Sequence, residues 1–218
     1  MRENTIRSKI PKAPSLGNLK NFPRGNVPNA EKNSNQKRKP KMKKTIIIIG
    51  LIVTFLIIYF LQANFFSWFT IAGIKPNLFI ILVLFISLFV GMKYGIVFGL
   101  IFGLFLDIVI GKTIEINTIM LTTVAILGGY FDKNFSKDSK ITIMLMVIGS
   151  TLLFEIGSYV LSIIMLNTNI EILSFLKIIL IEVLYNAILT VILYPLIQIV
   201  GYKIEDIYKG QKILTRYF

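Results

Sequence analysis

Long stretches without a charged side chain constrain the fold of this chain more than any other feature. Residues 45–74 contain no Asp, Glu, Lys or Arg, and further apolar stretches follow along the chain. A helix needs about 20 consecutive apolar residues to cross a hydrocarbon layer about 30 Å thick. Only 16% of the residues are charged, against about a quarter in soluble domains. The sequence therefore predicts an all-α membrane protein with several spans.

Six apolar stretches are interpreted as six transmembrane helices. They cover residues 45–61, 76–91, 94–111, 113–131, 141–166 and 178–202. The second to fourth stretches follow one another closely, which predicts tight helical hairpins. The predicted organisation is a tail (1–44), a six-helix transmembrane domain (45–205) and a C-terminal segment (206–218).

The N-terminal tail is strongly basic, with 13 basic and 2 acidic side chains among residues 1–44. It lacks the apolar periodicity that a packed core requires, and we expect it to be disordered. It ends in a cluster of cations: Lys37, Arg38, Lys39, Lys41, Lys43 and Lys44. Such a cluster beside a span attracts anionic lipid. Docking of a cytoplasmic partner is the other interpretation, whereas nucleic acid is not expected because no recognition element accompanies the charge.

The distribution of basic residues predicts the orientation. If the N-terminus lies inside, 21 of the 24 basic side chains fall on the inner side and 3 fall on the outer side. Loops on the cytoplasmic side of membrane proteins carry an excess of Lys and Arg. Six spans would therefore place both termini in the cytoplasm.

Two residue types are absent from the chain, which contains neither cysteine nor histidine. Their absence excludes disulfides, thiol nucleophiles, catalytic triads with histidine and histidine-ligated metal sites. No cofactor and no metal ion are expected.

The third stretch carries small residues at every fourth position. The positions are Gly91, Gly95, Gly99 and Gly103, followed by Asp107 and Gly111. A spacing of four keeps these positions on one stripe of a helix, where small residues allow another helix to approach closely. The stripe predicts packing within the protein's own bundle, and a surface for a partner protein is the alternative.

Three acids, Asp107, Glu155 and Glu182, lie within apolar stretches. Near the middle of a membrane each would cost about 2.5–3.5 kcal/mol. Counting about 1.5 Å per residue from the ends of the stretches places all three in the outer third of the layer. Asn77 and Asn186 fall nearby. Either the acids are tolerated beside the interface, or the five residues line an outward-opening recess for a polar ligand or a partner helix.

Two segments resemble one known family. Residues 74–119 are similar to the rod shape-determining protein MreD family, and residues 181–197 resemble the last helix of that family. The matching residues are Pro76, Asn77, Leu78, Gly91, Gly95, Gly99, Gly103, Asp107 and Gly111, with Glu182, Tyr185 and Pro195 in the last helix. The basic tail is longer than the family leads us to expect.

The resemblance implies a non-enzymatic scaffold of the cell-elongation complex in the bacterial inner membrane. Its implied partners are an MreC-like bitopic protein, bound through the membrane domain, an MreB-like filament and the wall synthases. The family shares a six-helix fold with the substrate-binding subunits of energy-coupling-factor transporters. The acidic recess would then be an inherited pocket.

Two alternative functions are compatible with a helical membrane protein. The first is a substrate-binding subunit of a vitamin transporter of the energy-coupling-factor type. Those subunits dock through alanines on the first helix, but residues 45–61 contain no alanine and a single glycine, Gly50. The second is an aspartate-based intramembrane hydrolase, which needs two aspartates where the spans offer only Asp107.

Overall fold

The computed structural model describes residues 30–110, 115–166 and 171–210, with side chains from residue 42 onward except at position 166. The chain forms two compact units, Met1–Lys41 and Met42–Phe218. Of the first unit only the backbone from residue 30 is described, and it is helical. Helix α1 (Ala30–Ala63) thus begins inside the segment expected to be disordered, while residues 1–29 lie outside the described part.

The second unit is helical throughout its described residues, apart from short connections and one isolated bridge between Ile71 and Ile74. After α1 the elements follow in the order α2 (Phe65–Trp68), α3 (Leu78–Phe85), the π-helix η2 (Ile86–Val90), α4 (Met92–Ile110), α5 (Ile116–Asn134), α6 (Lys140–Leu166) and α7 (Ile172–Lys209). Each of the six predicted stretches is therefore largely helical in its described residues, and the first and last helices begin before and end after their predicted bounds.

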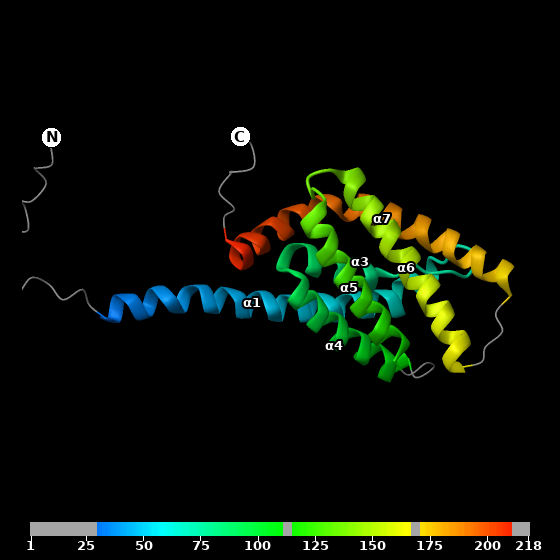
Figure 1. Ribbon diagram of the computed structural model, residues 1–218, viewed down its shortest axis with the longest axis horizontal. Helices are drawn as coiled ribbons and strands as arrows, with labels where there is room; N and C mark the ends of the chain where they lie inside the picture. The colour runs from blue at the N-terminus through cyan, green and yellow to red at the C-terminus, as the bar shows by residue number, and fades with distance from the viewer. Residues whose placement is uncertain (1–29, 111–114, 167–170, 211–218) are drawn as a thin grey trace, which may run out of the picture. The chain divides into compact units, whose positions relative to one another are not determined.

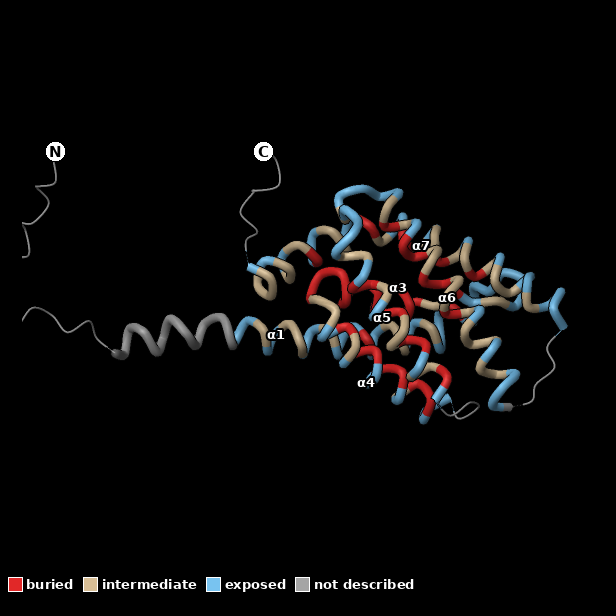
Figure 2. Tube along the Cα trace, viewed as in Figure 1, coloured by how far each residue is buried: buried red, intermediate tan, exposed pale blue. Residues whose placement is uncertain are grey.

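Helix α3 and its continuation η2 form the centre of the second unit. All 13 residues from Leu78 to Val90 are buried, and α3 lies among α4, α5, α6 and α7 (Figure 1). Figure 2 shows buried residues on α3 and on the parts of the neighbouring helices that face it. A helix that is apolar on every side belongs in such a position, because it has no polar face to leave exposed.

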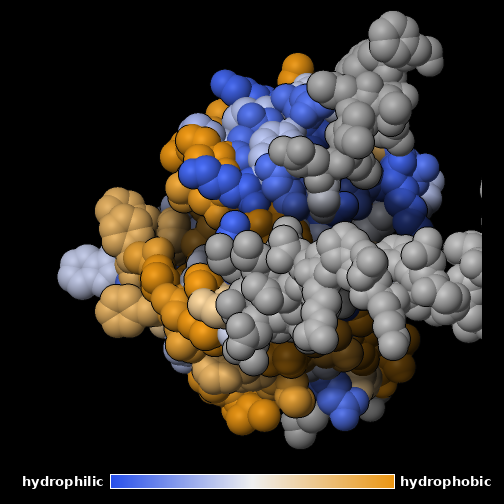
Figure 3. All heavy atoms as spheres, turned by 90° about the vertical axis from the view of Figure 1, so that its left-hand side faces the viewer, coloured by the Kyte–Doolittle hydropathy of each residue, from blue (hydrophilic) through white to orange (hydrophobic). Residues whose placement is uncertain are grey.

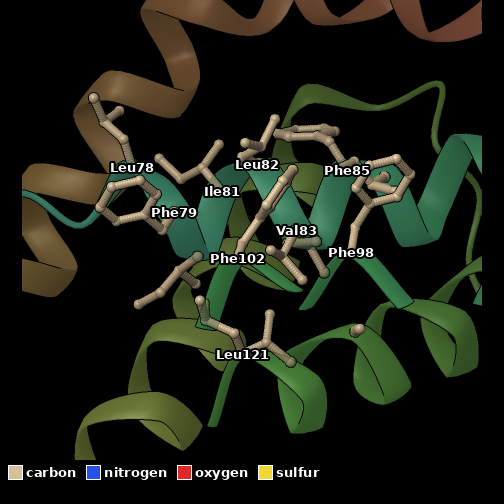
Figure 4. Close-up of a cluster of buried hydrophobic side chains, with 14 of the residues drawn as sticks. Leu78, Phe79, Ile81, Leu82, Val83, Phe85, Phe98, Phe102 and Leu121 are labelled. Atoms are coloured by element: carbon tan, nitrogen blue, oxygen red, sulfur yellow. The ribbon is translucent and has the colours of Figure 1, made fainter. Parts of the chain in front are cut away.

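The core around this central helix is aliphatic and aromatic. Figure 4 shows Phe98 and Phe102 of α4 and Leu121 of α5 gathered with side chains of α3. Helix α1 joins this core through Phe55, whose ring stacks on Phe102 at 4.0 Å and lies 5.4 Å from the ring of Phe79. Aromatic contacts of this kind stabilise by about 0.5–1.5 kcal/mol beyond the area that they bury.

Four helices are long and apolar enough to cross a membrane. They correspond to Met42–Trp68, Met92–Ile110, Lys140–Met165 and Ile172–Lys209. The central segment Leu78–Val90 is apolar but shorter, and α5 interrupts its apolar residues with Asn117 and three threonines. The chain thus has the build of a helical membrane protein.

Candidate functional site

Asp107 of α4 holds the first turn of α5. Its carboxylate accepts hydrogen bonds from the backbone N–H groups of Asn117 and Thr118 at 3.0 and 2.9 Å, and from their side chains at 2.9 and 2.6 Å. The first N–H groups of a helix have no partner within the helix. Asp107 is 5% exposed, and it caps α5 from a neighbouring helix. Its carboxylate is therefore engaged in the structure of the α4–α5 hairpin.

Glu155 of α6 and Glu182 of α7 meet each other. Their carboxyl groups lie next to one another, and the side chain of Asn77 lies beside Glu182. One carboxyl oxygen of Glu182 is buried without a hydrogen-bond partner. Asn186 is fully buried beside this pair. Its amide oxygen accepts the Asn77 backbone N–H at 2.9 Å, and its amide nitrogen donates to Thr151 at 3.1 Å.

These contacts fix the start of the central helix. Asn77 precedes α3, and its side chain makes no capping bond to that helix. The Asn77 backbone is held instead by Asn186, while its side chain reaches Glu182. The polar cluster thus ties the beginning of α3 to α6 and α7.

A small cavity of about 80 Å³ connects the two groups of acids. It is lined by Asn77 from the Glu155–Glu182 cluster, by Asn117 from the Asp107 cap and by Gln62 of α1. The side-chain oxygens of Gln62 and Asn77 are buried and have no protein hydrogen-bond partner. A water molecule takes about 30 Å³ of liquid volume, so the cavity has the size and the polar groups to hold one or two waters. The five predicted recess residues thus fall into two clusters, and of the five only Asn77 lines this cavity.

The glycine stripe of α4 is covered from within. A Cβ atom added at Gly103 would lie 2.4 Å from the Thr118 Cα, and one added at Gly99 would lie 3.0 Å from the Leu121 backbone oxygen. One added at Gly95 would lie 2.7 Å from the Ser87 side chain of η2. The glycines therefore let α4 approach α5 and η2 closely, as intramolecular packing predicts.

The two outer members of the stripe differ from these three. Gly91 has a φ of +118° and separates η2 from α4, so its role is conformational and a Cβ there would meet no neighbouring atom. This left-handed φ is one that only glycine adopts readily. Gly111 lies outside the described residues.

A cluster of charges holds the other end of the central helix. The Leu88 backbone oxygen of η2 accepts hydrogen bonds from the ammonium groups of Lys137 and Lys209, at 3.1 and 2.7 Å. Both lysines also bind Asp132 at 2.7 Å, and Glu205 lies 2.7 and 3.3 Å from them. The last carbonyl groups of a helix lack partners within it. The two lysines supply hydrogen-bond partners for the Leu88 oxygen, and the four charges neutralise one another.

The pKa values of Asp132 and Lys137 reflect this pairing. Burial alone would lower the pKa of Lys137, but its hydrogen bonds to Asp132 and Glu205 outweigh burial and raise that pKa. Burial likewise acts to raise the pKa of Asp132, and the bonds from Lys137 and Lys209 overcome it, so this pKa is lowered. Both groups are therefore held in their charged forms.

The loop between α5 and α6 is bound to α7 next to this cluster. Tyr202 donates its hydroxyl to the Asp138 carboxylate at 2.5 Å, and Tyr194 donates to the Asp138 backbone oxygen at 2.8 Å. Gln198 donates to the Lys137 backbone oxygen at 3.2 Å. Figure 3 shows hydrophilic residues gathered on one part of the surface beside a broad hydrophobic area.

Most of the predicted basic cluster lies outside the part of the chain whose side chains are described. The positions concerned are Lys37, Arg38, Lys39 and Lys41. Of the other two, Lys43 is exposed, and the Lys44 ammonium lies 5.2 Å above the ring of Tyr208 in α7.

Several residues of these clusters were not predicted from sequence. Thr151 and Gln62 carry no pattern that singles them out, and the sequence marks Lys137 only as one of the basic residues on the inner side. The spacing of Glu205 and Lys209, four residues apart on one helix, is a detectable signal of an ion pair. Their shared contact with Leu88 has no counterpart in the sequence.

Comparisons with known proteins yield one match. A family model described as rod shape-determining protein MreD matches residues 42–203, which cover nearly all of the second unit's described helices. No curated protein and no solved structure matches the chain.

Proposed function

The chain belongs to the family of the rod shape-determining protein MreD, and on this premise we propose that it is a non-enzymatic scaffold of the cell-elongation complex. In this role it links an actin-like cytoskeletal filament inside the cell to peptidoglycan synthesis outside and so regulates cell shape. The observation that carries the proposal is the extent of the family match, which spans residues 42–203 and therefore the helical body as a whole.

The proposed setting is the bacterial inner membrane, crossed six times with both termini in the cytoplasm. Four helices have the length and composition of spans, and α3–η2 and α5 would supply the two short crossings. The excess of basic residues on one side supports this orientation. In this arrangement the Lys137–Lys209 cluster faces the cytoplasm, and the Glu155–Glu182 cluster lies towards the outside.

The polar clusters support a structural role in preference to a catalytic one. Asp107 is engaged by four donors of α5, and Asn186 of α7 is hydrogen-bonded to Asn77 and to Thr151 of α6. These groups fasten helices to one another. A scaffold needs such internal fixation, since its surface must keep one shape while partners bind.

We further propose that an MreC-like bitopic protein binds the membrane domain, with an MreB-like filament and the wall synthases in the same complex. Because α5 and η2 cover the glycine stripe of α4, the partner helix would use an outward face. Exposed apolar residues of α4 such as Val97, Ile101 and Ile108 offer one. The basic tail would bind anionic lipid.

The vitamin-transporter alternative receives no support. The family match is to a shape-determining protein, and the cavity between the acid clusters measures about 80 Å³. That volume holds one or two waters at about 30 Å³ each.

Depletion of the protein in its native rod-shaped cell tests the proposal. We expect the cells to round up, and re-expression of the full chain should restore rods. Unchanged cell shape after complete depletion would refute the scaffold role.

The proposed topology is tested separately by single cysteines, which the chain lacks naturally. Cysteine at position 75 should react with a membrane-impermeant maleimide added to intact cells, whereas cysteine at position 203 should react only after the cells are opened. The reverse pattern, or labelling of both from outside, would overturn the orientation.

A further inference from the structure

A second, larger cavity lies between α1 and α7 and is floored by α3 and η2. It has a volume of about 400 Å³, and its walls include Leu51 and Ile58 of α1, Leu82 of α3 and Leu193 of α7. Among the described residues that line it, Thr54 is the one with a polar side chain, and its hydroxyl already donates to the Gly50 backbone oxygen at 2.8 Å. The cavity therefore offers its occupant apolar contacts alone.

Contacts at both ends of the cavity connect α1 or the segment after it to α7. At one end Tyr208 donates to the Lys44 backbone oxygen at 3.2 Å and lies beneath the Lys44 ammonium. At the other end Tyr185 donates to the Phe69 backbone oxygen at 2.7 Å, and its ring lies 6.3 Å from that of Phe66. Residues 185 and 208 are separated by about 34 Å along a straight helix. We call the part of α7 between these two tyrosine contacts the frame of the cavity. Its length is close to the thickness of the hydrocarbon layer.

We propose that this cavity binds one acyl chain of an anionic phospholipid, whose headgroup lies at the cytoplasmic end of the frame. An apolar cavity of this size does not hold ordered water, and left empty its lining loses dispersion contacts. A methylene group is somewhat smaller than a water molecule, whose share of liquid is about 30 Å³. The cavity therefore accommodates on the order of a dozen methylenes, which is a large part of one chain.

The size of the cavity favours a lipid chain over a partner helix. A helix about 10 Å across and about 30 Å long fills on the order of 2,000 Å³, whereas this cavity holds about 400 Å³. The protein's own residues 1–29 are also unsuited, because they are rich in Lys, Arg and Asn.

Positive charge at one end selects the headgroup. Lys44 lies seven residues before Leu51, and Lys203 lies three residues after Val200, so each cation continues the stripe of a residue that lines the cavity. Both belong to the end of the frame that carries the basic residues. Cations at this depth attract anionic lipid with about 1 kcal/mol each.

This site goes beyond the proposed scaffold function and depends only on the membrane setting. A lipid held here would add to the contact between α1 and the rest of the bundle, in which Phe55 is the buried α1 residue and Ile48, Leu51, Ile58 and Tyr59 are partly buried against the core. The lipid would act as a structural component of the fold.

Native mass spectrometry of the full chain in detergent, with added dioleoyl lipids, tests the proposal. We compare Leu193→Trp, which places a larger side chain in the cavity, with Ile192→Trp on the adjacent exposed position of the same helix. Leu51→Trp and Ile52→Trp form a second pair on α1. We expect one tightly bound phosphatidylglycerol per chain, at least tenfold less of it in both cavity variants, and no change in both controls.

Headgroup choice is measured with phosphatidylcholine carrying the same acyl chains. We expect phosphatidylglycerol to be preferred at least tenfold, with the preference lost in the double variant Lys44→Gln/Lys203→Gln and retained in Lys93→Gln. Equal binding of the two lipids by the wild type would overturn the anionic part of the proposal. Retention of lipid in folded Leu193→Trp and Leu51→Trp, judged by circular dichroism, would overturn the site itself.

A photocrosslinking amino acid at position 82, which lines the cavity and is buried, identifies the occupant in living cells. An adduct with the mass of a lipid supports the proposal. An adduct with a polypeptide would assign the cavity to a partner helix instead. Loss of lipid binding with normal cell shape would refute the lipid's importance while leaving the scaffold function intact.

Discussion

Replacing Asp107 by Asn should destabilise the protein, although the two side chains have nearly the same size. The carboxylate accepts four hydrogen bonds, two from backbone N–H groups and two from side chains of Asn117 and Thr118. An amide keeps one accepting oxygen and presents an NH₂ group in place of the other. Two of the four donors, one of them a backbone N–H of α5, then face another donor.

The size of the effect follows from the bonds that are lost. Hydrogen bonds to charged groups contribute about 1.5–3 kcal/mol each, and a helix N-cap contributes about 1 kcal/mol. These contributions overlap, since the lost backbone bond is itself the cap. We therefore expect Asp107→Asn to lower the free energy of unfolding by about 2–4 kcal/mol, on the same principles.

The assay is reversible unfolding of the full chain by sodium dodecyl sulfate in mixed micelles, followed by circular dichroism. Thr118→Val and the double variant complete a mutant cycle, because Thr118 donates its hydroxyl to Asp107 at 2.6 Å. We expect a coupling energy of about 1 kcal/mol between directly bonded residues. The control is Asp206→Asn, which lies at an exposed position.

The capping role would be refuted if the free energy of unfolding of Asp107→Asn lay within about 0.5 kcal/mol of that of the control, which is the usual scatter for surface substitutions. This result would also restore the interpretation of Asp107 as a residue open to an outer recess.

Four further outcomes are expected in the same assay. Gly103→Ala should cost about 1–3 kcal/mol through overpacking, since the added Cβ would lie 2.4 Å from the Thr118 Cα. Gly50→Ala, whose Cβ would meet no atom within 4 Å, should cost nothing. Equal effects of the two substitutions would contradict the close α4–α5 contact. Glu182→Gln should be tolerated within about 1 kcal/mol, because the amide keeps the size of the side chain and can donate to the neighbouring Glu155, while Glu182→Ala should cost about 2 kcal/mol. Lys137→Met should cost about 2 kcal/mol, less than a fully broken buried pair because Lys209 remains. Wild-type stability should fall at both extremes of pH. Because the pKa of Asp132 is lowered in the fold, its charge stabilises the fold above the ordinary pKa of 3.8, and this contribution is lost in acid. Because the pKa of Lys137 is raised in the fold, its charge stabilises the fold below the ordinary pKa of 10.5, and this contribution is lost in strong base. Unchanged pH dependence in Lys137→Met would show that the ion pair does not contribute to stability.

The sequence predicted the helices because each one is encoded locally. An uncharged apolar stretch has to form a helix in a membrane, where every backbone group must be paired within the segment. The central helix Leu78–Val90 was recognisable for the same reason, although its complete burial was not. The spacing of Gly95, Gly99 and Gly103 likewise fixed one face of α4, because residues four apart share a stripe.

The polar residues were identified from sequence, but their partners were not. Asp107, Glu155, Glu182, Asn77 and Asn186 stood out because polar groups in apolar stretches are costly. Periodicity assigns a side chain to a face of its own helix and carries no information about which helix lies opposite. The sequence could therefore place the acids at a similar depth without separating them into two clusters.

By itself, the amino-acid order determined that this chain is a helical membrane protein of the MreD family. It also determined that one helix carries a stripe of glycines and that acidic residues lie within otherwise apolar stretches. Only the tertiary structure decided that α5 covers those glycines, that Asp107 caps α5, and that Lys137 and Lys209 meet at the Leu88 oxygen. The reason is physical: Leu88 and Lys209 are separated by 121 positions, and a contact over that distance exists only once all the helices between them have packed.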